Sequence, residues 1–301
     1  MTLQDALRSG KVLLLDGAMG TQLMARGARG SNELWGIEHP DDLRAIHRGY
    51  VEAGASAIIA DTFGGSRPKL DRMGLAARLV ELNRRPVEIA REVARNGSDS
   101  VWVLGDVGPT GQFVEPYGDF SRAQMTDVFR EQIAVLAEAG VDGIIIETMM
   151  DPAEAECAVV AAKSVAPHLP VLASMTFERN PRGFHTVMGA TPEDAINRLA
   201  SAGADVVGAN CGGIAPKDYV DLLRTMHVVG KVPLLAEPNA GLPQIGPDGA
   251  TVYRETLEAF ARIAGPLREN GASVIGGCCG TTPEHIRAIA TALRGTTVHR
   301  G

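Results

Sequence analysis

One short pattern occurs four times in this chain and constrains its fold more than any other feature. In Glu52-Ala-Gly-Ala-Ser-Ala-Ile-Ile59, a glycine stands at the end of an expected helix and an apolar run follows it directly. Glycine commonly ends helices because it adopts the left-handed conformation without steric cost. The pattern therefore predicts helices that turn at once into buried strands. The other copies are Glu138-Ala-Gly-Val-Asp-Gly-Ile-Ile145, Ser201-Ala-Gly-Ala-Asp-Val-Val-Gly208 and Glu269-Asn-Gly-Ala-Ser-Val-Ile-Gly276.

Apolar runs that lack alternation predict eight strands covered on both faces. They are residues 11–16, 57–62, 101–106, 143–147, 170–175, 205–210, 232–237 and 273–277. Helices are expected at about residues 1–10, 41–54, 75–97 (with a break near Pro86), 121–140, 151 onward, 191–203, 216–229, 253–271 and 282–294. Eight strand–helix units with no linker or shift in composition predict an α/β fold, a (β/α)8 TIM barrel. We expect a single domain over residues 1–301, with its core at about 8–295.

The charge and composition argue against several classes of protein. The formal net charge is −7, which favours neither nucleic acid nor an anionic membrane as a partner. No apolar run approaches the roughly 20 residues that a membrane span needs, and the N-terminus lacks a signal-peptide core. The chain has 4 cysteines, two of them adjacent, and this is a poor disulfide framework. We therefore expect a cytoplasmic protein whose thiols bind a metal or take part in catalysis.

Polar residues follow the four repeated strands at matching positions. In barrel enzymes the active site lies at the face where the strands end, and side chains from alternate strands share a layer. We therefore expect Cys211 to meet Cys278 and Cys279 at this face. Seven and eight residues after the four glycines stand the pairs Asp61/Thr62, Glu147/Thr148, Asn210/Cys211 and Cys278/Cys279.

Three converging cysteines point to zinc, which binds sulfur in tetrahedral sites. A structural site normally supplies four ligands, whereas Cys211, Cys278 and Cys279 leave one position open, as catalytic zinc does. Glycines beside the adjacent pair would let the chain bend so that both cysteines reach one ion. An incoming thiol at the open position would bind as a thiolate at neutral pH, and such a site is suited to alkyl transfer to sulfur.

Other interpretations of these cysteines stay open at this point. An adjacent pair can be two buried free thiols or a vicinal disulfide, and a zinc ion can be structural in an unrelated barrel hydrolase. A barrel that binds zinc or a thiol without turnover, as a sensor, is a further alternative. Cys157 is a separate case, because it stands in an expected helix among Ala155, Ala158 and Val159; we expect it in the core.

Two acidic residues end strands at the same face. Asp16 ends the first expected strand and Glu147 ends the fourth. They can be solvated strand ends, but their position favours a role in binding a substrate ammonium group. The turn Asp16-Gly-Ala-Met-Gly20 would leave backbone N–H groups free to face a small anionic group.

Five motifs resemble those of the homocysteine S-methyltransferase family. The run Gly276-Gly-Cys-Cys-Gly-Thr-Thr-Pro-Glu-His285 is highly specific. The resemblance covers about residues 8–295 and is closest to the homocysteine-binding module of cobalamin-dependent methionine synthase. Methyltransferases that use betaine or S-methylmethionine are similar at a greater distance. The other four motifs are Leu13-Leu-Leu-Asp-Gly-Ala-Met-Gly-Thr21, Ala60-Asp-Thr-Phe-Gly64, Asn210-Cys-Gly212 and Glu237-Pro-Asn-Ala-Gly241.

The resemblance implies a zinc-dependent enzyme that transfers a methyl group to the thiolate of L-homocysteine and gives L-methionine. It implies that Cys211, Cys278 and Cys279 hold the zinc. It also implies that Asp16 and Glu147 bind the homocysteine ammonium group, and that Asn239 lies beside the metal at its open position. The substrate carboxylate would be bound by the backbone amides of Ala18, Met19, Gly20 and Thr21.

The methyl donor is the least constrained part of this interpretation. We expect the 301 residues to bind homocysteine and activate its thiol, which is one half of the reaction. We expect the donor to be a separate methyl-corrinoid protein, because the motifs are nearest to those of the modular methionine synthases. A stand-alone enzyme that uses a small sulfonium or ammonium donor, such as S-methylmethionine or betaine, is the alternative.

Overall fold

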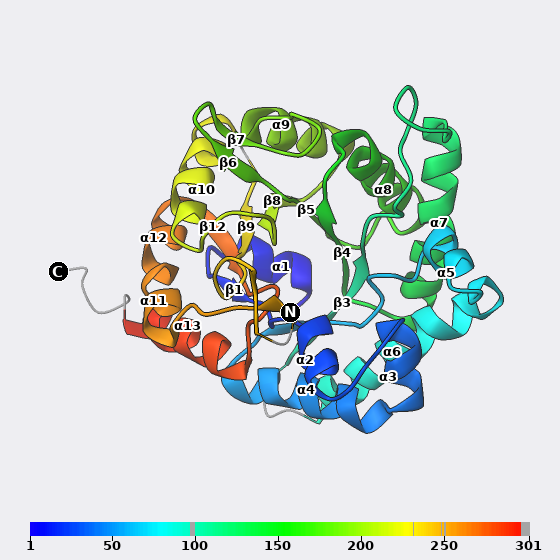
Figure 1. The fold of residues 1–301 in the computed structure, drawn as a ribbon, viewed down its shortest axis with the longest axis horizontal. Helices are drawn as coiled ribbons and strands as arrows, with labels where there is room; N and C mark the ends of the chain where they lie inside the picture. Colours follow the sequence, from blue (N-terminus) through cyan, green and yellow to red (C-terminus); the bar gives the residue numbers. More distant parts are fainter. Residues whose placement is uncertain (97–99, 231, 248, 250, 296–301) are drawn as a thin grey trace.

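The fold is a barrel of parallel strands inside a ring of helices (Figure 1). The computed structural model describes residues 1–96, 100–230, 232–247, 249 and 251–295. The strands form one 8-stranded sheet in the order β1-β12-β9-β8-β5-β4-β3-β2, and a parallel bridge between Leu15 and Ala57 joins its two edges. The predicted (β/α)8 barrel is therefore confirmed. The strands are β1 (Leu13–Leu14), β2 (Ala57–Ile59), β3 (Trp102–Val107), β4 (Gly143–Met149), β5 (Val171–Met175), β8 (Val206–Asn210), β9 (Leu234–Glu237) and β12 (Ala272–Ile275).

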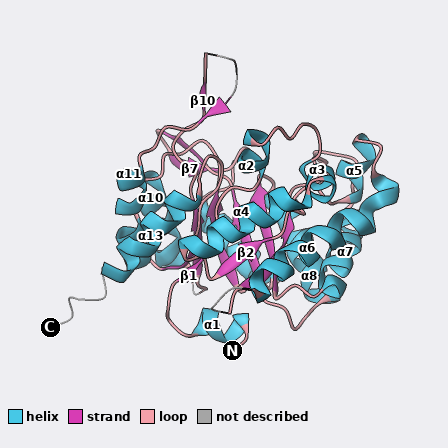
Figure 2. Ribbon diagram, turned by 90° about the horizontal axis from the view of Figure 1, so that it is seen from below, coloured by secondary structure: helices cyan, strands magenta, loops and turns pink. Residues whose placement is uncertain are grey.

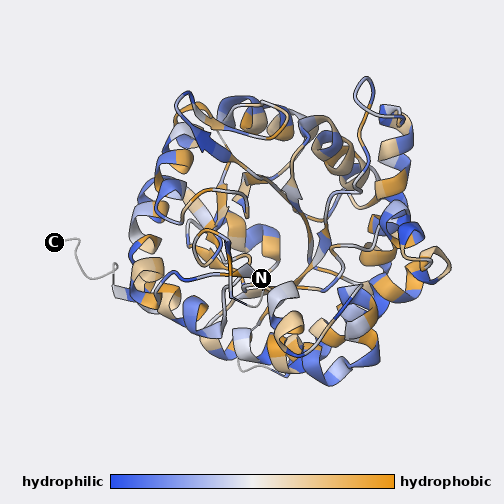
Figure 3. Cartoon of the chain, in the orientation of Figure 1, coloured by the Kyte–Doolittle hydropathy of each residue, from blue (hydrophilic) through white to orange (hydrophobic). Residues whose placement is uncertain are grey.

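Hydrophobic and hydrophilic residues alternate along the helices of the outer ring (Figure 3). Signals in the sequence set several helix ends: Ser121 accepts a hydrogen bond from the Gln124 N–H at the start of α7, and Gly140 ends that helix with φ +87°. No helix in the described part of the chain combines the length and apolar composition that a membrane crossing requires. The ring consists of α4 (Pro40–Ala53), α6 (Leu79–Arg95), α7 (Arg122–Ala139), α8 (Pro152–Val165), α9 (Pro192–Ala202), α10 (Asp218–Val229), α11 (Leu257–Arg262), α12 (Ala264–Glu269) and α13 (Pro283–Gly295).

Pro86 lies inside α6 without ending it, so the break expected at this proline is wrong. Proline removes the N–H group that would bond to the carbonyl of Leu82, and this weakens one turn of the helix. Pro86, Leu82 and Val87 are nevertheless buried, and α6 packs against α4 and α7 on either side. Tertiary packing therefore holds the helix continuous where local propensity disfavours it. Residue 97 of this expected helix, and residues 296–301 of the expected domain, lie outside the described residues.

The loops fold more elaborately than the sequence analysis predicted. The helix expected at residues 253–271 is divided into α11 and α12, and residues 253–256 form a loop before it. Elements of two to seven residues contain too few turns or alternations to give a periodic signal. The additional elements are α2 (Gly20–Ala25), α3 (Asn32–Glu38), α5 (Arg67–Arg72), the 3-10 helix η1 (Ala76–Arg78), the hairpin of β6 (Glu178–Asn180) and β7 (Gly183–His185), and the hairpin of β10 (Gln244–Ile245) and β11 (Thr251–Val252).

The first helix covers one end of the barrel (Figure 2). α1 (Leu3–Arg8) buries Leu3 and Leu7 in one cluster with strand residues such as Leu104 and Ile145. Leu3 also occupies space beside Gly143, where an added Cβ would stand 2.8 Å from Leu3 Cδ2. Because α1 covers this end, the cavity described below lies at the other end, where the strands finish and from which β10 projects (Figure 2).

Candidate active site

Three cysteine sulfurs converge at the carboxyl ends of two strands. Cys211 follows β8, and Cys278 and Cys279 follow β12. Their Sγ atoms all lie within 4.8 Å of one another, and those of Cys211 and Cys279 are 3.9 Å apart. Two sulfurs bound to one tetrahedral zinc ion at about 2.3 Å would stand about 3.8 Å from each other. The predicted convergence is therefore present, and the donor set and its spacing fit a metal ion that prefers thiolate ligands.

The loop after β9 connects the two segments that carry the cysteines. The Cys278 N–H donates to the Pro238 carbonyl at 2.9 Å, and the Ala240 N–H donates to the Cys279 carbonyl at 2.9 Å. Cys211 adopts the left-handed conformation with φ +53°, which is uncommon for a residue with a side chain. The chain therefore turns away from the direction of β8 at Cys211, where the sulfur of this residue lies near those of Cys278 and Cys279.

The three thiols already favour one negative charge among them. Hydrogen bonds from Cys211 and Cys278 lower the pKa of the Cys279 thiol to about 3. The corresponding contacts with Cys211 and Cys279, together with burial, raise the pKa of Cys278 well above its ordinary value. A second and third thiolate in so small a volume would require a bound cation.

Five carboxyl groups stand at or near the carboxyl ends of strands on this face of the barrel: those of Asp16, Asp61, Asp106, Glu147 and Glu237. Asp16 accepts a hydrogen bond from the Ile59 N–H at 3.0 Å through Oδ2, while its Oδ1 is buried and has no hydrogen-bond partner among the described residues. A carboxylate oxygen only accepts hydrogen bonds, so such buried oxygens are suited to a ligand that donates them. Unpartnered buried oxygens also occur on three other members of this group: Asp61, Asp106 and Glu237.

Burial controls the protonation of these acids. Desolvation raises the pKa of Glu147 to about 7, although a hydrogen bond with Asp106 opposes the shift. Desolvation also raises the pKa of Asp16 well above its ordinary value, against the hydrogen bond from Ile59, and the charge of Glu147 adds to the rise. Both groups ionise more readily when a positive charge enters the site. The region therefore has the electrostatic character expected of a site for an ammonium group.

A cavity of about 330 Å³ joins the cysteines to the acids. This volume is at the lower end of the range for small-molecule sites in proteins. Ile59 and Phe63 contribute apolar surface to its wall. Of the residues predicted from the sequence, the structure places these on the wall: Ala18, Met19, Gly20, Thr21, Glu147, Cys211, Cys278 and Cys279.

The two remaining predicted residues lie close behind this wall. Asp16 directly precedes Gly17, which lines the cavity. Asn239 is buried in the loop after β9, where its Nδ2 donates to the Gly212 carbonyl at 3.2 Å. The Oδ1 of Asn239 is buried and has no hydrogen-bond partner in the described part of the chain, so it is available to a ligand.

The turn after Asp16 is less open than the sequence analysis predicted. The Ala18 N–H donates to Thr281 Oγ1 at 3.0 Å, so this amide already has a partner. Gly20 and Thr21 instead begin α2, whose first N–H groups have no partner within the helix. The backbone N–H groups of this turn that are free to bind an anion therefore lie at its C-terminal end, where α2 begins.

Asp106 and Glu237 were not predicted as site residues, yet both line the cavity. They end the third and seventh expected strands, whereas the repeated pattern marks the second, fourth, sixth and eighth. Applying the strand-end rule to every strand of the barrel would have found them. Asn210 ends the sixth expected strand, and the sequence indicated no role for its side chain.

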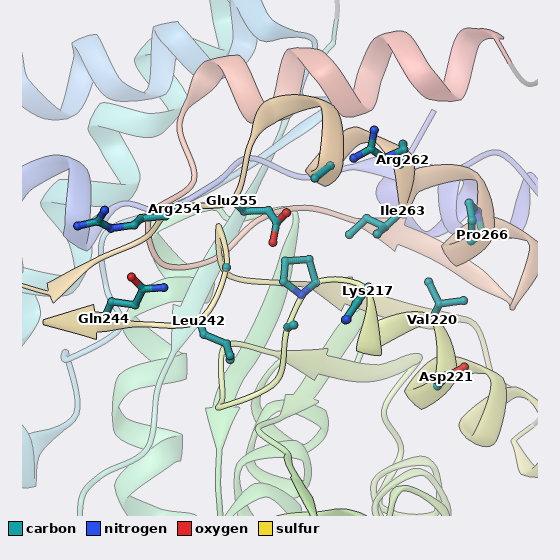
Figure 4. Close-up of a pocket in the computed structure, with 14 residues that line it drawn as sticks. Lys217, Val220, Asp221, Leu242, Gln244, Arg254, Glu255, Arg262, Ile263 and Pro266 are labelled. Atoms are coloured by element: carbon teal, nitrogen blue, oxygen red, sulfur yellow. The ribbon is translucent and has the colours of Figure 1, made fainter.

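A second and larger cavity lies on the rim of the barrel and differs in chemistry (Figure 4). Its volume is about 770 Å³, and its wall includes the exposed cations Lys217, Arg254 and Arg262. None of the three cysteines or the five strand-end acids lines it. One backbone hydrogen bond links it to the loop after β9, because the Glu255 N–H donates to the Ala240 carbonyl at 2.9 Å. The smaller cavity, with its sulfurs and acids, is therefore the candidate active site.

Fold and site together define a class of protein: a TIM-barrel enzyme whose site combines clustered thiols with buried carboxyl groups where the strands end. The chain belongs to the homocysteine S-methyltransferase family, whose sequence profile matches residues 13–293. The family resemblance found in the motifs is thereby confirmed, and the chain is an enzyme of that family.

Two mycobacterial proteins are similar in sequence to this chain. The methionine synthase of Mycobacterium tuberculosis (strain ATCC 25618 / H37Rv) is 35% identical over 300 residues, and that of Mycobacterium leprae (strain TN) is 33% identical over 298 residues. The alignments cover 95% and 94% of this chain but 25% and 24% of the relatives. The chain therefore spans about a quarter of the length of the curated relatives it matches.

A solved structure of similar size also matches. The homocysteine methyltransferase MmuM from Escherichia coli, in its metallated form, superposes with a TM-score of 0.78 at 27% identity. The match covers 96% of this chain and 99% of that chain. The apo form of the same enzyme gives a TM-score of 0.72 at 28% identity.

Proposed function

We propose that this chain transfers a methyl group to the sulfur of L-homocysteine and so produces L-methionine. The observation that carries the proposal is the cavity itself, in which three clustered sulfurs face buried carboxyl groups across about 330 Å³. Homocysteine has the complementary groups, a thiol at one end and an ammonium group with a carboxylate at the other. Membership of the homocysteine S-methyltransferase family supports this acceptor.

Zinc is the proposed metal, and Cys211, Cys278 and Cys279 are its proposed ligands. A set of three thiols that leaves one position open is typical of catalytic rather than structural zinc. When bound, zinc would lower the pKa of the homocysteine thiol and present it as a nucleophilic thiolate. The unpartnered Oδ1 of Asn239 is the proposed protein group at the open position before substrate arrives.

The acids and the turn after β1 are proposed to orient the substrate. Glu147 and Asp16 would accept hydrogen bonds from the homocysteine ammonium group, whose positive charge favours the ionised form of both carboxyl groups. The substrate carboxylate would be bound by amides of Met19, Gly20 and Thr21, since the Ala18 N–H is already bonded. Fixing both the ammonium group and the carboxylate of the amino acid would direct its thiol toward the cysteines.

A separate methyl-corrinoid protein is the proposed donor. The sequence relatives are methionine synthases several times longer than this chain, which supports a reaction shared with other modules. One observation favours a second candidate, a small sulfonium or ammonium donor. MmuM matches along 99% of its own length, so a homocysteine methyltransferase of this size has a fold of this kind.

A donor assay tests the proposal. The zinc-loaded protein is mixed with L-homocysteine and, in separate reactions, with a methylated corrinoid protein, S-methylmethionine or betaine, and methionine is measured. Methionine above the level formed by the Cys211→Ala variant in at least one reaction is the expected result, and the productive donor identifies the class. Zinc-dependent binding of homocysteine with no methionine from any donor would instead indicate a non-catalytic thiol-binding barrel.

A further inference from the structure

Asn210, at the end of β8, lies between the acids and the sulfurs and contacts both. It is wholly buried, and its Nδ2 donates to Oε2 of Glu147. The same nitrogen lies 2.8 Å from Thr148 Oγ1 and 3.7 Å from Cys278 Sγ. One amide group therefore touches a proposed ammonium-binding residue and a proposed zinc ligand.

The other end of the amide fixes its orientation. Oδ1 accepts hydrogen bonds from the Thr148 N–H at 2.7 Å and from Ser174 Oγ at 2.8 Å. A backbone N–H can only donate, so the atom that faces it must be the amide oxygen. The Nδ2 group is consequently directed at Glu147 and Cys278, and it cannot exchange places with Oδ1 without losing the bond to Thr148.

Asn210 also stabilises an uncommon backbone conformation next to Glu147. Thr148 has φ +60°, and Cys211, which follows Asn210, has φ +53°; among the described residues these are the two non-glycine residues with positive φ. A left-handed conformation is strained for a β-branched residue, so it persists only where neighbouring contacts hold it. The bond from the Thr148 N–H to Asn210 is such a contact. This bond holds the backbone next to Glu147 and thereby the direction in which the Glu147 side chain leaves β4.

We infer that Asn210 is a positioning residue that couples the homocysteine ammonium site to the thiolate centre. This inference rests on the proposed function. Through Oδ1 it holds the turn at Thr148, and through Nδ2 it orients Glu147 and donates to the sulfur of Cys278. A donor directed at a metal-bound thiolate withdraws electron density from the sulfur and fixes its position, as partners of metal ligands commonly do. Loss of this amide should therefore change the metal centre and the affinity for homocysteine together.

The experiment compares two buried asparagines. Asn210→Asp keeps the size of the side chain but replaces its N–H donors by an oxygen beside Glu147 and Cys278. Asn83→Asp is the matched control, because Asn83 is also wholly buried and its Nδ2 donates to the carbonyls of Gly65 and Leu79, neither of which lines the cavity. Each variant, with all 301 residues of the chain, is loaded with Zn²⁺ or Co²⁺. Zinc affinity is measured by competition with a chelator, the thiolate-to-Co²⁺ charge-transfer band by absorption, and KM and kcat with homocysteine.

Asn210→Asp is expected to weaken zinc binding about 10- to 100-fold, to shift the Co²⁺ band and to raise KM for homocysteine. Asn83→Asp is expected to lower the melting temperature while leaving the band and KM at the parent values. A folded Asn210→Asp protein with the parent's zinc affinity, band and KM would overturn the inference. So would equal changes in Asn83→Asp.

The remaining outcomes are also decisive. If Asn210→Asp does not fold, Asn210→Ala is measured in the same way; if neither variant folds, the coupling role is abandoned in favour of a structural one. A parent protein that binds no zinc or no homocysteine overturns the proposed function itself, and the inference with it. If the parent protein binds both zinc and homocysteine and the Asn210→Asp variant matches it in zinc affinity, absorption band and KM, only the role of Asn210 is overturned.

Discussion

The Sγ atoms of Cys211 and Cys279 lie 3.9 Å apart although 68 positions separate the two residues in the chain. The strand order explains this distance, because β8 and β12 are both neighbours of β9 in the sheet. Their carboxyl ends are therefore only two strand spacings apart, about 10 Å at the backbone. The bends of the chain at Cys211 and after Gly277 allow the side chains to close the remaining gap. The site thus depends on a tertiary relationship between two loops.

Removal of one sulfur should abolish tight metal binding without unfolding the barrel. Cys211→Ala leaves two of the three proposed ligands, so the zinc affinity should fall roughly 100-fold or more. Cys157→Ala is the control, because Cys157 is buried in α8 outside the cluster, and this variant should retain zinc. Zinc content after dialysis against a weak chelator and circular dichroism measure the two effects. Unfolding of Cys211→Ala on loss of metal would indicate a structural zinc site instead.

Homocysteine binding should weaken as the pH falls through about 7. The pKa of Glu147 is raised to about 7 by burial, so below that pH the group is increasingly protonated and offers no charge to the ammonium group. KM should therefore rise on the acid side, and Glu147→Gln should raise it about tenfold or more at pH 8 while removing much of this dependence. Steady-state kinetics from pH 6 to 9 measure both effects.

Glu154→Gln provides the control for the Glu147 measurement. The pKa of Glu154, like that of Glu147, is raised by desolvation, but the Glu154 Oε1 accepts hydrogen bonds from the N–H and Oγ1 of Thr110, and Glu154 does not line the cavity. Its substitution should leave KM and the pH profile at the parent values. An unchanged profile in Glu147→Gln would show that another group binds the ammonium end.

A side chain at Gly280 should disturb the metal site. Gly280 has φ +79°, and a Cβ there would stand 2.4 Å from Cγ of Tyr253. Gly280→Ala should therefore cost about 1–3 kcal/mol of stability from overpacking and should displace the adjacent Cys279, which weakens zinc binding. Gly10→Ala separates the two effects, because Gly10 has φ +73° with no atom within 4 Å of an added Cβ. It should cost about 1 kcal/mol from backbone strain alone and leave zinc affinity unchanged, as chelator competition would show.

The helix that covers the other end of the barrel should contribute to stability and not to binding. Leu3 is 2% exposed and packs among the residues of the barrel interior. Leu3→Ala should lower the free energy of unfolding by about 2 kcal/mol or more, because it leaves a cavity. Val80→Ala, at a site that is 52% exposed, should change it by no more than about 0.5 kcal/mol. Urea denaturation measures both, and a raised KM in Leu3→Ala would contradict the assignment.

The sequence determined the architecture because its signals are local. Glycines such as Gly54 and Gly140 end helices in the left-handed conformation, and unbroken apolar runs mark strands buried on both faces. Counting along the repeated pattern was enough to place Cys211, Cys278 and Cys279 at one face of a barrel. Position within a strand fixes which end of the barrel a residue occupies, so convergence followed from the count.

Only the tertiary structure decided how these residues relate to their neighbours. Pro86 stays helical because α4 and α7 pack beside it, and the Ala18 N–H is taken by Thr281 from the far end of the chain. Asn210 bonds to Thr148 and touches Cys278, contacts between segments 62 and 68 positions apart. Hydrogen bonds of this kind require distant segments to be placed to within a few tenths of an ångström, and no local pattern in a sequence specifies that placement.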